Sequence, residues 1–95
     1  MLDLYHNLPH LDLHGYDREY ARIAINDFIN DNYKMKNYKV IIVHGIGSGI
    51  LKRTTQLTLK SNRYVEEYKI DNFNDGQTII KIKKRLWHIS LFVLL

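Results

Sequence analysis

Apolar and polar positions along the chain change their spacing in a regular way. They alternate first, over residues 11–15 (LDLHG). This period of two predicts a short strand that turns Leu11 and Leu13 towards a core. Asp12 and His14 are then expected to share the opposite face of that strand.

The next segment has helical spacing. Asp17 suits the N-cap position, and we expect the helix to run from Arg18 to Asn32. Its polar face carries charged residues, and its apolar stripe has the i, i+3, i+4, i+7, i+8 spacing of an amphipathic helix. The stripe consists of Ala21, Ala24, Ile25, Phe28 and Ile29.

A buried strand is predicted at 39–43 (KVIIV), where β-branched residues form a continuous run. Two strands joined by a single helix are parallel, and their crossover is right-handed. If the strands are neighbours, His14 and His44 both lie at carboxyl ends, on the edge where open α/β sheets bind ligands.

A second helix is expected after the glycines, ending near Asn62, and two further strands at 64–70 and 78–83. The turn-rich segment 72–76 between these strands predicts an antiparallel hairpin. The element order is βαβαββ. It predicts an α+β two-layer sandwich, with a four-stranded mixed sheet and two helices on one face. The inner stripe of the second helix is predicted to be Leu51, Thr55 and Leu59.

The strand-to-helix connection is rich in glycine, at alternate positions from 45 to 49. Glycine permits positive φ and has no Cβ, so the loop amides and the helix amino terminus can face an anion. A purely structural turn is the alternative. Neither a Walker loop nor a dinucleotide fingerprint fits, because Ile50 and Leu51 stand where these motifs need other residues. The candidate nucleic-acid-binding residues are Gly45, Gly47, Ser48, Gly49, Lys52 and Arg53.

Three side chains near this loop are candidates for catalysis: Asp12, His14 and His44. Asp12 can orient His14, and the loop amides with a neighbouring cation can stabilise a pentavalent phosphorane. The alternative for each histidine is a capped or solvated side chain at a strand end. A metal site formed by the three residues lacks diagnostic spacing, so we assign no metal ligands.

Length and composition limit the choices further. A chain of 95 residues accommodates one domain with a modest core. It has no cysteine, which excludes disulfides and thiolate metal sites and makes an intracellular, cytoplasmic setting the expectation. The net charge is +4. The segment 34–63 contains no acid, and we expect it to bind polyanions; the alternative is an ordinary solvated surface. Its basic residues are Lys34, Lys36, Lys39, Lys52, Arg53, Lys60 and Arg63.

The two ends differ from the middle. We divide the chain into an N-terminal extension (1–10), a domain (11–84) and an apolar C-terminal tail (85–95). The extension has neither the basic start nor the apolar run of a signal peptide. The tail is shorter than the ~20 apolar residues that span a bilayer, so no transmembrane segment is predicted. The alternatives for it are an added strand, a membrane-surface element, a self-association contact, or an incidental extension with no role in the fold.

Two motifs in this order resemble a known family. LDLHG at 11–15 and HGIGSGILK at 44–52 are similar to the two signatures of the Smr (small MutS-related) domain. The resemblance covers residues 11–83. The family's Asp-x-His falls on Asp12 and His14, and its glycine motif on Gly45, Gly47 and Gly49. The sequence departs from the family at three places. Position 46 is often basic in the family and is Ile46 here, and a proline common after the second helix is replaced near Arg63. The glycine-rich turn before the last strand keeps only Gly76.

The resemblance implies a fold like the carboxy-terminal domain of translation initiation factor three. It also implies nucleic-acid binding and, in many members, endonuclease activity on RNA or DNA, often connected with stalled ribosomes. The first hypothesis is therefore an endonuclease acting mainly on single-stranded or ribosome-bound RNA. His14 would be the base for attack by the 2′-hydroxyl, with Lys52 and His44 handling phosphate charge.

Three alternatives stay open. Cleavage through an activated water would bring a divalent metal near Asp12. The same patch would also serve a non-catalytic module that binds nucleic acid or the ribosome. A scaffold that self-associates through its tail is the third.

Overall fold

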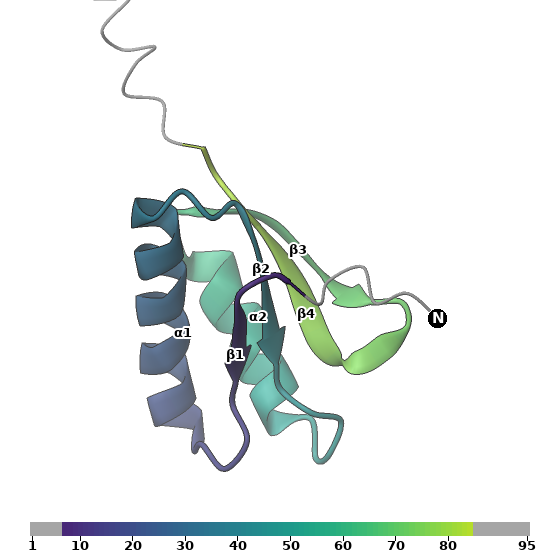
Figure 1. Cartoon of the computed structure of the whole chain (residues 1–95). Helices are drawn as coiled ribbons and strands as arrows, with labels where there is room; N and C mark the ends of the chain where they lie inside the picture. Colours follow the sequence, from purple (N-terminus) through teal and green to yellow (C-terminus); the bar gives the residue numbers. More distant parts are fainter. Residues whose placement is uncertain (1–6, 85–95) are drawn as a thin grey trace, which may run out of the picture.

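The computed structural model describes residues 7–84 and confirms the predicted element order (Figure 1). The elements in chain order are β1 (His10–Asp12), α1 (Arg18–Lys34), β2 (Lys39–Val43), α2 (Ile50–Ser61), β3 (Val65–Asp71) and β4 (Asn74–Ile82).

The four strands form one mixed sheet in the order β1-β2-β4-β3. β1 runs parallel to β2, with Asp12 opposite Val43. β4 lies between β2 and β3 and is antiparallel to both. The predicted parallel pairing of the first two strands is therefore confirmed.

Both helices cover the same face of the sheet. Ile25 of α1 and Leu59 of α2 belong to one buried cluster with Val40 and Ile42 of β2. Alternate residues of β4 complete this cluster, because successive side chains of a strand point to opposite faces. The predicted two-layer arrangement is thus confirmed, and it closes the core without a disulfide.

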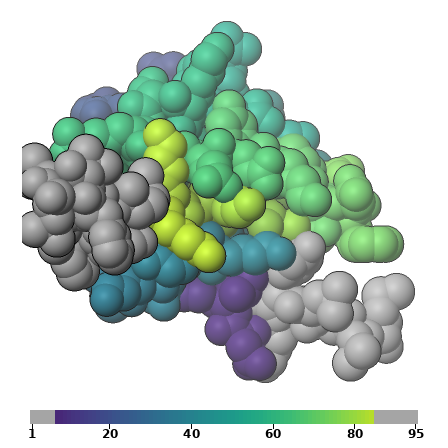
Figure 2. Space-filling model, turned by 90° about the horizontal axis from the view of Figure 1, so that it is seen from above, coloured from purple at the N-terminus to yellow at the C-terminus, as the bar shows by residue number. Residues whose placement is uncertain are grey.

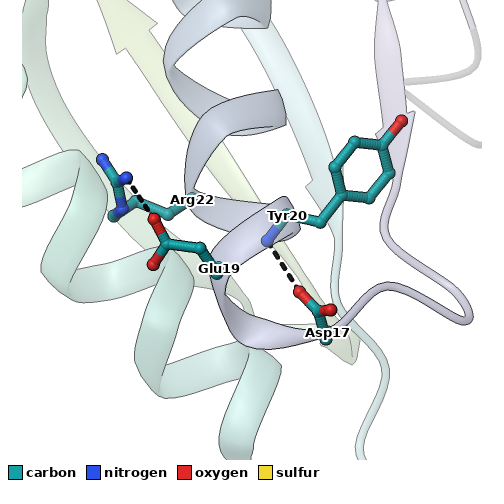
Figure 3. Close-up of polar contacts among 4 residues, drawn as sticks. All are labelled: Asp17, Glu19, Tyr20 and Arg22. Carbon is teal, nitrogen blue, oxygen red and sulfur yellow. Dashed lines mark hydrogen bonds and ion pairs between the residues drawn. The ribbon is translucent and has the colours of Figure 1, made fainter.

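The start of α1 is fixed by its first turn. The Asp17 carboxylate accepts a hydrogen bond of 2.8 Å from the backbone N–H of Tyr20, which confirms the predicted N-cap (Figure 3). Glu19 and Arg22, one turn apart on the exposed side, form an ion pair in the same view.

The end of α1 lies two residues beyond the predicted end at Asn32. The Asn32 side chain is buried, and its amide donates to the carbonyl of Phe28 at 2.8 Å. Asn37 donates to the Asn32 side-chain oxygen from the following loop. A residue typical of loops therefore stays inside the helix, because the tertiary structure satisfies its polar atoms.

The turn between β3 and β4 is tighter than the predicted segment 72–76. Asn74 already pairs with Asp71, and only Asn72 and Phe73 connect the two strands. A bulge between Ile70 and Asp71 adjusts the register. β4 therefore begins four residues before the predicted start at Thr78.

The interpretations of the apolar tail (85–95) and of most of the N-terminal extension lie outside the described residues. β1 begins at His10, one residue before the predicted boundary of the domain. Neither helix of the described part is long and apolar enough to cross a membrane.

Candidate nucleic-acid interface

Three connections lie on the same edge of the sheet: the β1–α1 loop, the glycine loop between β2 and α2, and the β3–β4 turn (Figure 1). The strand directions require this, since β1, β2 and β3 end at this edge and β4 begins there. Hydrogen bonds join the three. Leu13 N–H donates to the Val43 carbonyl at 2.9 Å, and the N–H groups of His44 and Gly45 both donate to the Gly76 carbonyl at 2.9 Å.

His14 lies in a turn and not on a strand. The Asp12 carboxylate accepts the backbone N–H of His14 at 2.9 Å, which ends β1 at Asp12. The expectation that the two side chains share one strand face is therefore wrong. Asp12 holds the turn that carries His14, and the His14 side chain is exposed. Leu13 between them is fully buried, as predicted.

His44 is held inside the protein, with only 7% of its surface exposed. Its Nδ1 lies 2.9 Å from the Gly45 carbonyl and its Nε2 lies 2.8 Å from the Thr78 hydroxyl. A carbonyl only accepts, so Nδ1 carries a proton, and in the neutral ring Nε2 accepts from the Thr78 hydroxyl.

Burial is the main cause that lowers the pKa of His44, and the charge of Lys52 acts in the same direction. The Gly45 carbonyl opposes both. Neutral His44 has no free ring nitrogen to offer a phosphate. The geometry makes it a positioning residue that ties the glycine loop to β4.

The glycine loop is open on its outer side. Gly45 and Gly49 have φ of 76° and 84°, in the left-handed region that favours glycine. A Cβ placed on Gly45, Gly47 or Gly49 would meet no atom within 4 Å in the described structure apart from those of its own residue and its two chain neighbours. There is room here for a ligand to approach the backbone closely.

The amino terminus of α2 adds donors to this opening. The Ile50 amide contacts the Ser48 hydroxyl at 3.4 Å, a long hydrogen bond, while the first intrahelical bond starts only at Arg53. The amides of Leu51 and Lys52 therefore have no partner within the helix. The first turn reads ILKR and contains no acid that would repel an anion. Lys52 is half-buried beside the loop, and Arg53 is exposed.

The rest of the basic segment is elsewhere. The chain returns to the opposite edge of the sheet after each helix, so the cations near the helix ends lie far from the glycine loop. Figure 2 shows that opposite edge, with the α1–β2 connection, the end of α2 and the end of β4 side by side. The acid-free segment is therefore divided in space, and two of its seven basic residues, Lys52 and Arg53, lie at the loop. The other five are Lys34, Lys36, Lys39, Lys60 and Arg63.

Several residues at this edge were missed by the sequence interpretation. Thr78 is fully buried and hydrogen-bonded to His44. Asp71 is 5% exposed, and its two carboxylate oxygens accept from Phe73 N–H and the Gln77 amide. A hydroxyl at the start of the apolar run TIIKI was the available signal for Thr78. Within residues 7–84, no group of three His, Cys, Asp or Glu side chains is arranged to hold a metal ion.

Comparison with known proteins gives consistent matches. The family described as "Smr domain" matches residues 11–83. The chain is 34% identical over 76 residues to the "Endonuclease MutS2" of Clostridium botulinum, a match that covers 77% of this chain but 10% of that protein. The chain thus spans about a tenth of the length of the curated relatives it matches.

Two solved structures share the fold. The crystal structure of the Smr domain of Thermus thermophilus MutS2 superposes with a TM-score of 0.77 at 18% identity, covering 80% of this chain and 99% of that domain. YdaL, a stand-alone small MutS-related protein from Escherichia coli, gives 0.75 at 20% identity, covering 79% of this chain and 64% of that chain.

Proposed function

This chain belongs to the Smr domain family, and on that premise we propose that it binds nucleic acid at the glycine-loop edge and cuts it as an endonuclease. One observation carries the proposal. The pairing of β1 with β2 brings the exposed His14 turn beside an open glycine loop and the amino terminus of α2.

Phosphate binding is the first part of the proposal. The free amides of the first turn of α2 and the positive end of its dipole face the same opening as the loop. Lys52 and Arg53 add two positive charges beside this opening. The relatives are named "Endonuclease MutS2", so we propose that these charges contact the phosphates of a nucleic acid. Ile46 offers no charge at the loop tip, so binding depends on the amides and on these two side chains.

Proton transfer is the second part. His14 is the candidate base, because its ring is exposed beside the phosphate opening. On RNA it would take the proton of a 2′-hydroxyl, and that oxygen would then bond to the neighbouring phosphorus. The bond to the 5′-oxygen of the next nucleotide would break, and the expelled oxygen would take a proton from solvent. Asp12 acts through the backbone, because it holds the turn on which His14 sits. The loop amides would stabilise the charge that develops on the phosphorane.

A binding module without catalysis is the second candidate. The buried state of His44 favours it, because one of the two histidines at the edge is used for structure, and among the described residues His14 is the exposed histidine there. Ribosome association, a divalent metal at Asp12 and a cytoplasmic location are further parts of the sequence-based hypothesis that stay proposals.

The deciding experiment measures cleavage of a labelled single-stranded RNA and a labelled DNA by the purified full chain, with and without a chelator. We expect His14→Ala to lower the cleavage rate on the order of 10²-fold or more with little change in binding. Asp12→Asn is expected to be milder, because an amide oxygen can still accept the His14 N–H. A 2′,3′-cyclic phosphate in the product supports attack by the 2′-hydroxyl, whereas a 5′-phosphate and sensitivity to chelator support activated water.

Leu13→Ala is the control for folding. Leu13 is fully buried between the two site residues, so this variant should lose roughly 2–5 kcal/mol of stability. Its folded fraction should cut at the wild-type rate. If wild type binds but never cuts, the endonuclease is excluded and the binding module takes its place. If His14→Ala cuts as fast as wild type, His14 is not the base, and the proposed mechanism is excluded.

A further inference from the structure

Phe73 is the large apolar side chain with the greatest exposure in the described part of the chain. It is 87% exposed, compared with 70% for Ile46 and 60% for Met35. It occupies the tip of the β3–β4 turn. An aromatic ring held in water at a turn tip contributes little to the core, and its faces are open to contact with a group outside the fold.

The turn that carries Phe73 is built from inside. The buried Asp71 carboxylate accepts the Phe73 N–H at 2.9 Å with one oxygen and the Gln77 amide at 2.8 Å with the other. Both oxygens are satisfied, and the backbone of the tip is fixed before any ligand arrives. Preorganisation of this kind lowers the ordering cost of binding.

The same turn is attached to the glycine loop. Gly76, three residues after Phe73, accepts two backbone hydrogen bonds from His44 and Gly45 at the start of that loop. The positions of the ring and of the loop are therefore coupled through a short stretch of β4. His44 strengthens this link, because its Nε2 accepts from Thr78 on the same strand.

Charge separates the roles of the two elements. The loop and the first turn of α2 offer amides, Lys52 and Arg53, which suit phosphate. The segment 71–76 (DNFNDG) carries two acids and no cation, which suits contact with an uncharged group. A single-stranded nucleic acid presents both chemistries side by side, since each nucleotide joins a phosphate to a flat, uncharged base.

We propose that Phe73 stacks on an unpaired nucleobase of the strand whose phosphate is held by the glycine loop. The inference rests on the proposed nucleic-acid binding and adds the class of strand to it. A duplex already uses its base faces for stacking, so the ring favours single-stranded segments of RNA or DNA.

The test is the affinity of the full chain for labelled oligonucleotides of roughly 12 nucleotides, measured by fluorescence anisotropy. Single-stranded RNA and DNA are compared with an abasic strand of the same length and charge. The variants are Phe73→Ala, Phe73→Trp and Met35→Ala. Met35 is the matched control, because it is also an exposed apolar side chain but lies at the carboxyl end of α1, on the opposite edge.

We expect Phe73→Ala to weaken binding of the base-bearing strands about 5- to 100-fold and to leave the abasic strand within twofold of wild type. Phe73→Trp should restore affinity, and Met35→Ala should bind as wild type. The RNA and DNA arms show which sugar the site prefers. Melting temperatures should stay equal, since the Phe73 side chain is almost fully exposed.

Equal binding of the base-bearing strands by wild type and Phe73→Ala would overturn the inference and leave the proposed function standing, with the ring free for a protein contact. An equal fall in affinity for the abasic strand would also overturn it. If wild type binds no strand at all, the proposed function fails, and stacking fails with it.

Discussion

The position of His44 beside the glycine loop made it a candidate for catalysis, but its surroundings in the fold give it a structural role. Its two ring nitrogens are hydrogen-bonded to Gly45 and Thr78, and burial lowers its pKa. Burial disfavours the protonated ring, and in the neutral ring Nδ1 donates to the Gly45 carbonyl while Nε2 accepts from the Thr78 hydroxyl. His44 therefore links the site to the stability of the fold.

This link predicts a pH dependence of stability. The pKa of His44 in the folded protein lies below its ordinary value of about 6.5, so the unfolded chain binds more protons between the two values. Stability should rise with pH across this window and fall as the pH is lowered from about 7 to 5. Urea unfolding of wild type and His44→Gln over this range provides the measurement.

In His44→Gln the dependence should be weaker. This variant should also lose roughly 1–3 kcal/mol near neutral pH, where the ring is neutral and both hydrogen bonds are intact. Thr78→Val is a useful companion, because it removes only the hydroxyl that donates to Nε2. If the curves of wild type and His44→Gln stay parallel from pH 7 to pH 5, His44 is not the titrating group.

At the scale of the element, a glycine in the loop can serve a left-handed backbone or leave room for a ligand, and the sequence pattern does not separate these two roles. Gly49 has a left-handed backbone and forms the N-cap of α2, whereas Gly47 does not have a left-handed φ. Both positions are open to the outside. We expect Gly49→Ala to lower stability by about 1 kcal/mol, because an alanine is strained at this φ.

Gly47→Ala is the matched variant for this element. It should leave the unfolding free energy unchanged and weaken oligonucleotide binding, because its methyl group comes between the phosphate and the loop amides. Chemical denaturation and anisotropy on the two variants separate strain from ligand contact. Wild-type binding by a folded Gly47→Ala would mean that the ligand does not approach the loop at Gly47.

At the scale of the whole molecule, the fold divides the basic segment between two edges. The charges of Lys52 and Arg53 lie at the glycine loop, and those of Lys34 and Lys60 lie at the carboxyl ends of α1 and α2. Each pair carries two positive charges, so the pairs differ only in their distance from the glycine loop.

We therefore expect Lys52→Ala with Arg53→Ala to weaken RNA binding across sequences and to reduce the salt slope by about one for each phosphate that the variant no longer neutralises. Lys34→Ala with Lys60→Ala removes the same charge and should keep most of the slope. The measurement is the dissociation constant over a series of salt concentrations. Equal effects in the two double variants would indicate a diffuse field and no localised binding edge.

The order of elements, the mixed sheet and the family follow from the sequence alone. Local periodicity is enough to predict α1, because apolar residues such as Ile25 and Ile29 recur with the helical period on its buried face. The parallel pairing of β1 and β2 also follows, since one helix between two strands allows no other direction. These features depend on spacing and chain direction, which a sequence records.

Only the tertiary structure decided which polar atoms meet. His14 and His44 are equivalent in the sequence, yet one is exposed and the other is bonded to Thr78, which lies 34 positions further along the chain. The sequence placed Phe73 in a turn, but the hydrogen bond of its backbone N–H to the buried Asp71 carboxylate is visible only in the folded structure. Burial and hydrogen bonding of a single side chain depend on partners distant in sequence, and periodicity contains no information about these partners.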